Sequence, residues 1–289
     1  MSFSERLAAD QALIEAHLLA ALAGRADQPV ADAMRYGLRG GKRLRGFLVL
    51  ESARMLGVPE EQSIAAAAAV EALHAYSLVH DDLPCMDDDD LRRGQPTVHR
   101  QWDEAVAILA GDALQTLAFE LLCDPSLGSA EVRLALVAGL ARASGIDGMV
   151  LGQALDIAAE TALRPLTLEE VTALQAGKTG ALISFAAEAG AIIAGMDPAP
   201  LRRYAAALGL AFQIADDILD VTGNEARTGK RLQKDAGAGK VTFVSLLGLE
   251  GAKMRATAFA DEAEAALSGY GKDAANLNEA ARFVISRDR

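Results

Sequence analysis

The sequence predicts an all-α fold, a single bundle of roughly ten or more helices around a central cavity. Alanine and leucine predominate among the 289 residues, prolines number only 8, and runs of β-branched residues are few. These preferences favour helices over strands. The chain has no strand-like alternation of apolar and polar residues, no repeat of fixed period and no long linker, so we expect one domain over residues 1–289.

Hydrophobic spacing and helix breakers give the expected order of elements. Thr167, followed by Glu170 three residues on, is the expected N-cap of one helix. In the first half we expect a helix over 3–23, a break at 24–29, a basic turn at 34–45 leading into a helix to about Gly57, and a helix from Val58-Pro59 to the aspartates at 81. Further helices are expected at about 103–123, within 130–160 on either side of 144–148, from Thr167 to about 176, and after Gly177 to Gly180 as far as Gly195. The last expected elements are a helix from Pro198 to Val221, a glycine- and charge-rich loop at 223–239, and helices from Val241 onward.

Charge and composition exclude several classes of protein. The formal net charge of −12 argues against non-specific nucleic-acid binding. Nine acidic residues lie in segments 81–90 and 216–220, and removing their charges leaves −3 for the rest of the chain. Two cysteines imply no disulfide framework and favour a reducing compartment. The N-terminus lacks a signal-peptide pattern and the apolar segment 181–196 is short for a membrane span, so we expect a cytoplasmic protein that does not span a membrane.

Six aspartates fall within residues 81–90, and two arginines follow at once. An isolated run of this kind is usually a solvated acidic turn. Here the preceding residues 64–79 are alanine-rich and apolar, which places the first aspartates at the end of a buried helix. Pro84 ends that helix and lets Asp87 turn back towards them. Such carboxylates suit a hard divalent cation, Mg²⁺ above all, and the arginines suit the phosphates that it carries.

A second acidic group lies in an otherwise apolar helical pattern. Asp216 and Asp220 are one turn apart, with about 6 Å between their Cβ atoms, and Asp217 lies between them. Buried carboxylates on one face require compensation, for which a bound cation is the simplest source. The alternative is a solvated acidic face. Two such groups on separate helices, with arginines nearby, form a more specific pattern than either group alone.

Four basic groups would, together with the metal sites, bind polyanions such as two diphosphates, although each alone resembles an ordinary surface cluster. The residues are those at 40–45, Arg92-Arg93, Lys178-Thr179 and those at 230–240. Gly177-Lys178-Thr179 is not a nucleotide-binding loop, because position 172 holds threonine where that motif needs glycine and no strand precedes it.

Histidine and cysteine chemistry is limited. Glu71 and His74 have the spacing used by carboxylate-bridged di-iron bundles, but the sequence offers no second such pair. His74 is then either a phosphate donor or a core histidine with satisfied hydrogen bonds, and His80 a structural hydrogen-bond partner. Cys85 has no basic helper placed by the sequence, so we assign it no nucleophilic role. Catalysis would therefore rest on metal and leaving-group chemistry.

Together these motifs resemble the trans-isoprenyl diphosphate synthases, and within them the bacterial members that make farnesyl diphosphate. The similarity covers nearly the whole chain. The matching segments are Gly40 to Arg45, Glu71 to Gly94 with its two-residue insertion Pro84-Cys85, Gly111-Asp112, Lys178-Thr179, Phe212 to Asp220, and Gly229-Lys230. Two positions depart from the family pattern: Gly46 replaces a usual proline, and Leu151 interrupts a usually glycine-paired segment before Gln153.

The resemblance implies a Mg²⁺-dependent condensation of isopentenyl diphosphate with allylic diphosphates in a central substrate cavity of a homodimeric enzyme. It implies three Mg²⁺ ions held by Asp81, Asp82, Asp87, Asp216, Asp217 and Asp220. It implies contacts to the allylic substrate from the catalytic set Arg92, Lys178, Thr179 and Gln213, and from Lys230 and Lys240. It implies that Lys42, Arg45, His74 and Arg93 bind isopentenyl diphosphate.

Helix geometry bears on product length. Tyr76 and Ser77 precede Asp81 by five and four residues, about 6–7.5 Å along a helix, where a ring would form the floor of a pocket for the growing chain. We expect a C15 product from dimethylallyl and geranyl primers. Rival functions are a geranylgeranyl or geranyl diphosphate synthase, a terpene cyclase, and a regulatory subunit. The basic set for a second diphosphate argues against the cyclase, and the two intact aspartate groups argue against the subunit.

Overall fold

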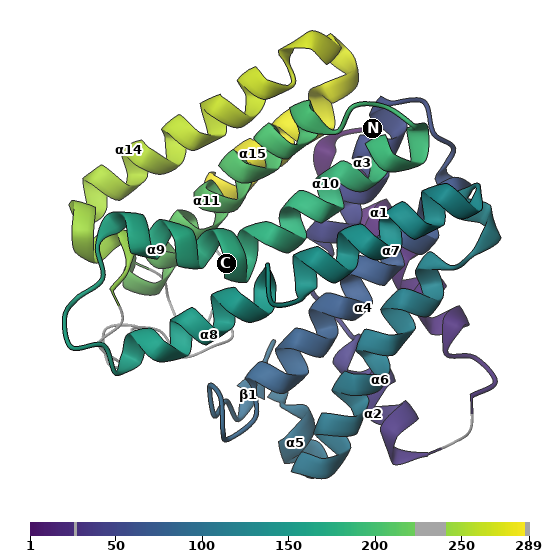
Figure 1. Ribbon diagram of the computed structural model, residues 1–289, viewed down its shortest axis with the longest axis horizontal. Helices are drawn as coiled ribbons and strands as arrows, with labels where there is room; N and C mark the ends of the chain where they lie inside the picture. The colour runs from purple at the N-terminus through teal and green to yellow at the C-terminus, as the bar shows by residue number, and fades with distance from the viewer. Residues whose placement is uncertain (26–27, 223–240, 287–289) are drawn as a thin grey trace.

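The computed structural model describes residues 1–25, 28–222 and 241–286, and helices dominate it (Figure 1). The elements, with short 3-10 or π turns marked η, are α1 (Phe3–Ala21), α2 (Pro29–Gly37), α3 (Leu44–Met55), η1 (Glu60–Gln62), α4 (Ile64–Asp81), β1 (Leu91–Arg92), β2 (Gln95–Pro96), α5 (Val98–Gln101), α6 (Glu104–Leu122), η2 (Pro125–Leu127), α7 (Ala130–Ser144), α8 (Met149–Glu160), α9 (Leu168–Gln175), η3 (Ala176–Gly180), α10 (Ala181–Ala194), α11 (Ala199–Thr222), α14 (Phe243–Ala266), η4 (Ser268–Ala274) and α15 (Ala275–Ser286). The all-α prediction is confirmed.

Side-chain caps determine where several helices begin. Ser2 and Glu5 form a reciprocal capping box at the start of α1, and Thr167 and Glu170 form the predicted one at the start of α9. Asp103 caps α6 by accepting a hydrogen bond from the backbone of the helix. Because these contacts span only three residues, the sequence alone locates the starts of these helices closely.

Helix α4 carries the first aspartate group at its C-terminal end and packs against α1, α3 and α6 (Figure 1). Residues 65–70 are fully buried, and their small side chains allow close helix packing. At Gly111 of α6 a Cβ atom would overlap the ring of His80. That ring lies with Nε2 3.0 Å from the carbonyl oxygen of Ile108. The structural role predicted for His80 is therefore confirmed, and Gly111 provides the space for it.

A two-stranded hairpin, β1–β2, follows the aspartates and was not expected from the sequence pattern. Leu91 pairs with Pro96 and Arg92 with Gln95. Arg93 and Gly94 occupy the two central positions of the turn with φ angles of 53° and 73°, as a type I′ turn requires. Two-residue strands are too short to show alternation, which is why the pattern gave no signal for them.

The segment Gly177 to Gly180 is also different from the expected boundary between two helices. It forms a wide π turn, η3, through which the helix continues from α9 into α10. Glycines allow α8 to approach this turn, since a Cβ atom on Gly152 would overlap the backbone of Lys178. A π turn displaces side chains from the regular helical register and is frequent at functional sites.

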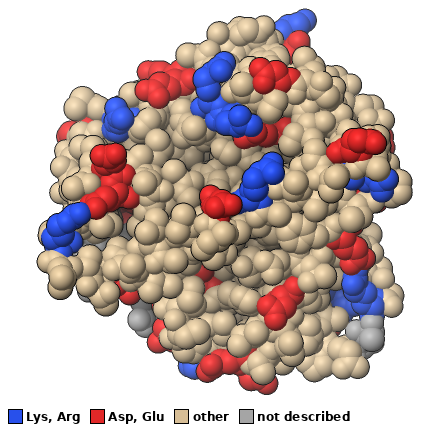
Figure 2. Space-filling view, viewed as in Figure 1, with Lys and Arg blue, Asp and Glu red and all other residues tan. Residues whose placement is uncertain are grey.

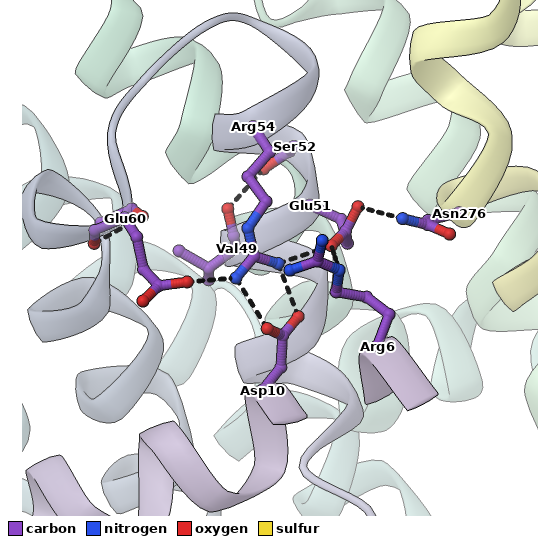
Figure 3. Close-up of polar contacts among 9 residues, drawn as sticks. Arg6, Asp10, Val49, Glu51, Ser52, Arg54, Glu60 and Asn276 are labelled. Atoms are coloured by element: carbon purple, nitrogen blue, oxygen red, sulfur yellow. Dashed lines mark hydrogen bonds and ion pairs between the residues drawn. The ribbon is translucent and has the colours of Figure 1, made fainter. Parts of the chain in front are cut away.

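Arg54 of α3 lies among three carboxylates that join four elements (Figure 3). Its guanidinium nitrogens lie 2.7 Å from Asp10, 2.5 Å from Glu51 and 2.6 Å from Glu60. Glu51 also accepts a hydrogen bond of 2.9 Å from the side chain of Asn276. This network ties α1, α3, η1 and α15 together.

Two helical stretches of the described chain, Glu104–Leu122 and Ala130–Glu160, have the length and apolar composition of a membrane span. The core helices of globular proteins share this length and composition, and the second stretch is divided between α7 and α8. Figure 2 shows uncharged side chains covering most of one face, with acidic and basic groups scattered among them. Exposed apolar residues on these helices include Leu109, Leu134 and Leu155.

Candidate active site

The chain after α4 folds back on itself and returns Asp87 to the helix end. The amide of Asp87 donates a hydrogen bond of 2.8 Å to the carbonyl of Asp81, and the amide of Asp89 donates one of 3.2 Å to the carbonyl of Asp82. Burial raises the pKa of Asp81 to about 6, with a further contribution from the carboxylate of Asp87 and an opposing one from Lys178. The predicted return of Asp87 is thus present.

Arg92 is held by the first aspartate group. Its Nε and Nη2 atoms donate hydrogen bonds of 2.6–2.8 Å to both carboxylate oxygens of Asp82, a bidentate arrangement. Asp82 is buried, and burial raises its pKa while Arg92 opposes that change. The hairpin therefore fixes Arg92 beside the end of α4, as its predicted role next to a substrate phosphate requires.

Lys178 of the π turn reaches the same region. Its Nζ lies 2.7 Å from Oδ2 of Asp156 on α8, and it is close enough to Asp81 to lower the pKa of that carboxyl group. Asp156 is 7% exposed. The sequence analysis missed Asp156. The available signal was an acidic residue in an apolar helix, three positions after Gln153.

The next residue of the turn connects to the second aspartate group. Thr179 donates a hydrogen bond of 3.3 Å to the side chain of Gln213, whose amide nitrogen donates one of 3.0 Å to Asp217. The other carboxylate oxygen of Asp217 accepts a hydrogen bond of 2.8 Å from the backbone amide of Phe243, at the start of α14. Lys178 and Thr179 therefore stand between the two aspartate groups.

Contacts through Lys178, Thr179 and Gln213 thus connect the two acidic groups, and their joint action in one metal site stays a prediction. Asp216 and Asp220 lie half-buried on α11 with Asp217. Among the described residues, no three His, Cys, Asp or Glu side chains converge closely enough to form a ready-made metal cluster. The available donors are carboxylate oxygens, with Arg92 and Lys178 near those of Asp82 and Asp81. This donor type fits Mg²⁺, which commonly takes one or two carboxylates plus phosphate oxygens.

A cluster of arginines surrounds the half-buried His74, about two helical turns before the aspartates. We call Arg43, Arg45, Arg92 and Arg93 the arginine cluster. Desolvation lowers the pKa of His74 well below its usual value, and the four guanidinium groups lower it further. Like charges held together in this way favour an anionic ligand. Three of the four residues predicted for isopentenyl diphosphate, namely Arg45, His74 and Arg93, are brought together here.

The role of the fourth predicted residue, Lys42, stays a prediction. Its ammonium group is 5.3 Å from the ring centroid of Phe283 on α15, a cation–π contact. Lys230 and Lys240, as well as the predicted loop 223–239, lie outside the described residues.

Arg43 and Glu71 also belong to this region. The sequence indicated Arg43 only as part of the basic segment 40–45, and Glu71 only through its spacing from His74. Arg43 is buried and in the left-handed region; it donates to the carbonyl of Leu38 and lies 3.5 Å from Glu71. The other carboxylate oxygen of Glu71 accepts a 2.9 Å hydrogen bond from the amide of Gly46. A proline at position 46 would have no amide hydrogen for this bond. Glycine, which replaces the proline usual in the family, can therefore donate it.

Tyr76 lies on α4, five residues before Asp81. Its ring packs edge-on against His80, with centroids 5.1 Å apart. Burial raises its pKa, and the carboxylates of Asp81 and Asp112 raise it further. The hydroxyl of Ser77 donates a 2.9 Å hydrogen bond to the carbonyl of His74 on its own helix. Of the two positions predicted to set chain length, Tyr76 therefore presents the bulkier group, and its role stays a prediction.

Comparison with known proteins agrees with this site. Residues 27–281 match the family described as "Polyprenyl synthetase". The chain is 49% identical over 271 residues to the farnesyl diphosphate synthase of Escherichia coli, covering 90% of each protein. It is 43% identical to the chloroplastic geranylgeranyl pyrophosphate synthase of Capsicum annuum, covering 90% of this chain and 72% of that one.

A solved structure agrees over the full length. The apo structure of an FPP/GFPP synthase from Zymomonas mobilis superposes with a TM-score of 0.89 at 44% identity, covering 98% of this chain and 99% of that one. With the family matched over most of its length, the chain belongs to the polyprenyl synthetases.

Proposed function

We propose that this protein is a prenyltransferase that condenses isopentenyl diphosphate head-to-tail with dimethylallyl and then geranyl diphosphate to give farnesyl diphosphate. The observation that carries the proposal is the position of Lys178 and Thr179. This turn connects with the second aspartate group through Gln213 and faces Asp81 of the first. The bacterial relatives named farnesyl diphosphate synthase, 44–49% identical, support the C15 product.

The allylic diphosphate would lie between the aspartate groups. Ionisation of its C–O bond leaves a diphosphate whose growing negative charge must be stabilised, and preorganised cations do this effectively. Lys178 and Arg92 are held near that position by Asp156 and Asp82. Bound Mg²⁺, held by Asp81, Asp82, Asp87, Asp216, Asp217 and Asp220, would supply further charge neutralisation to the leaving group.

The second substrate would bind at the arginine cluster. Arg45, His74 and Arg93 would hold the diphosphate of isopentenyl diphosphate so that its double bond faces the allylic carbon. The new C–C bond forms at that carbon, and the proton lost from the condensed chain passes to the departing diphosphate, which is a base. No side-chain base is needed, which agrees with the sequence, where neither the histidines nor Cys85 was assigned a role as base or nucleophile.

We further propose one catalytic domain over residues 1–289, a cytoplasmic location and a homodimer. The free thiols of Cys85 and Cys123, both exposed, favour a reducing compartment. The apolar surface of α6, α7 and α8 supports a subunit interface, because exposed apolar residues of this number are costly in a monomer. Sedimentation measurements would distinguish the dimer from the monomer.

The test is incubation of the purified chain and Mg²⁺ with labelled isopentenyl diphosphate and each allylic primer, followed by analysis of chain length. We expect a C15 product from dimethylallyl and geranyl primers. A C20 product would favour the alternative, a geranylgeranyl diphosphate synthase, to which the chain is also similar. If this chain forms no condensation product under conditions in which a related synthase is active, the prenyltransferase proposal would be contradicted.

A further inference from the structure

A cavity of about 340 Å³ lies between α2, α4 and the β1–β2 hairpin. This volume is within the range of small-molecule sites. Its walls include Tyr36 and Arg39 from the end of α2, Leu78 and Asp82 from α4, and Arg93 and Val98 from the hairpin and α5. We call it the side cavity.

The side cavity opens on a different face of α4 from the proposed active site. His74, Ser77 and Asp81 recur at helical spacing and share one face of the helix. Leu78 and Asp82, which line the side cavity, follow Ser77 and Asp81 by one residue and are therefore rotated about 100° around the helix axis. The side cavity and the active site thus lie on neighbouring faces, separated by the pair Asp82–Arg92.

The charges that line the side cavity do not balance. Its lining holds three arginines, at positions 39, 92 and 93, and one acidic residue, Asp82. Both carboxylate oxygens of Asp82 are engaged by Arg92. Arg93 donates one hydrogen bond of 2.6 Å to the carbonyl of Arg39, and the guanidinium of Arg39 lies 5.8 Å from the ring centroid of Tyr36. The guanidinium groups of Arg39 and Arg93 therefore line the side cavity without a close ion pair to an acidic residue of the lining, from which only the longer-range attraction of Asp82 acts on Arg93.

Apart from Gln95 and Thr97, the remaining side chains of the lining are mostly apolar. Leu78, Val79, Pro96, Val98 and the ring of Tyr36 form the apolar part, and Val79 and Val98 are buried. The hydroxyl of Tyr36 donates a 2.7 Å hydrogen bond to the carbonyl of Pro96, which holds the hairpin against α2 and keeps the walls together. A ligand with an anionic head and a short branched apolar tail would match both parts of this lining.

We propose that the side cavity binds a small amphipathic anion, a phosphate or diphosphate ester of a short branched alkyl chain, and that its occupation weakens binding of the second substrate through Arg93. Arg93 belongs to both sites, since it lines the side cavity and is one of the arginines facing His74. A ligand that draws its guanidinium into the side cavity removes one cation from the arginine cluster. By linkage, the two ligands then weaken each other's binding equally. This regulatory part rests on the proposed function, whereas the binding part does not.

The probe is 3-methylbutyl phosphate, which has no double bond and cannot be condensed. Binding to the full chain is measured by titration calorimetry without Mg²⁺. Arg39→Ala removes a cation of the side cavity but keeps the backbone carbonyl used by Arg93, and Gln95→Trp fills the space at the rim. Both should weaken binding by about tenfold or more, as expected for a lost charge-assisted contact. The control Arg100→Ala removes an exposed arginine near the hairpin, paired with Asp90, and should not weaken it.

Arg45→Ala locates the probe. Unchanged binding in this variant supports the side cavity. Lost binding in Arg45→Ala together with full binding in Arg39→Ala would place the probe at the active site and overturn the proposal, as would no binding to the unaltered chain. Thermal unfolding of each variant verifies that it folds.

Kinetics test the regulatory part. In the unaltered enzyme the probe should raise the KM for isopentenyl diphosphate, and in Arg39→Ala, with basal turnover unchanged, it should raise that KM far less. An equal rise in both proteins would mean simple competition at the active site and would overturn the regulatory part. Absence of turnover in every protein would count against the proposed function alone, because the calorimetric result stands without catalysis.

Discussion

Nζ of Lys178 lies 2.7 Å from Oδ2 of Asp156, an ion pair between residues 22 positions apart in the chain. Asp156 is buried on α8, and Lys178 lies on the π turn that follows α9. A buried carboxylate needs a partner, and here that partner is a predicted catalytic cation. The pair therefore fixes the direction in which Lys178 can approach a substrate diphosphate.

Asp156→Asn retains the shape of the side chain but removes the charge that holds Lys178. We expect turnover to fall by about 10- to 100-fold, while the KM for isopentenyl diphosphate changes little because the arginine cluster is intact. Steady-state kinetics with both substrates measure this. Asp147→Asn, an exposed carboxylate just before α8, is the matched control. Equal turnover in the two variants would rule out a positioning role.

Asp81→Ala and Asp216→Ala should each lower turnover by at least about 10²–10³-fold, because each removes a carboxylate that would hold Mg²⁺ on the leaving group. A chelator should abolish activity of the unaltered enzyme, and added Mg²⁺ should restore it. Asp90→Ala, an exposed aspartate of the first segment paired with Arg100, should retain most activity. Full activity of Asp81→Ala would contradict the metal assignment.

Tyr76→Ala should lengthen the product beyond C15, because it removes the ring that would close the pocket below Asp81. Tyr76→Phe keeps the ring and should leave the product at C15, which separates the effect of bulk from that of the hydroxyl. Chromatography of labelled products gives the chain lengths. Should Tyr76→Ala still release only C15, another residue must form the floor.

The stability of the protein should depend on pH through His74. Desolvation and the arginine cluster lower its pKa in the folded state, so below about pH 6.5 the unfolded chain binds a proton that the folded one does not. The free energy of unfolding should then fall as the pH drops, by at most about 1.4 kcal/mol per pH unit from this group.

His74→Gln lacks this titration, so its free energy of unfolding should decrease less than that of the unaltered protein between pH 7 and pH 5.5. Urea unfolding at each pH provides the comparison. Parallel curves for the two proteins would show that the pKa of His74 is the same in the folded and unfolded states.

Arg54→Met should destabilise the fold by about 3 kcal/mol, because it leaves Asp10, Glu51 and Glu60 without the cation that they share (Figure 3). Arg25→Met breaks an exposed ion pair with Glu120 and should cost less than about 1 kcal/mol. Denaturant unfolding of both variants tests the difference. A similar cost for the two would show that the Arg54 network is not a special stabilising feature.

The helices, many of their ends and the family could be predicted from the amino-acid sequence. Apolar spacing, caps such as Thr167 and breakers such as Pro84 act within a few residues, so they predict helices and their ends from local sequence. The same short-range signals predict that Asp81 lies at a helix end and that the chain turns back to bring Asp87 near it, as the hydrogen bond between their backbones shows. The family followed from motifs that are themselves short and contiguous.

Tertiary structure alone decided which distant groups meet. It paired Lys178 with Asp156, directed Lys42 to Phe283, and gave Asp217 the amide of Phe243 as a partner. These contacts join residues that are tens or hundreds of positions apart, and they depend on how helices pack. Helix packing depends on how whole helix surfaces fit together. The spacing of residues along one helix does not specify which residues of another helix it will contact.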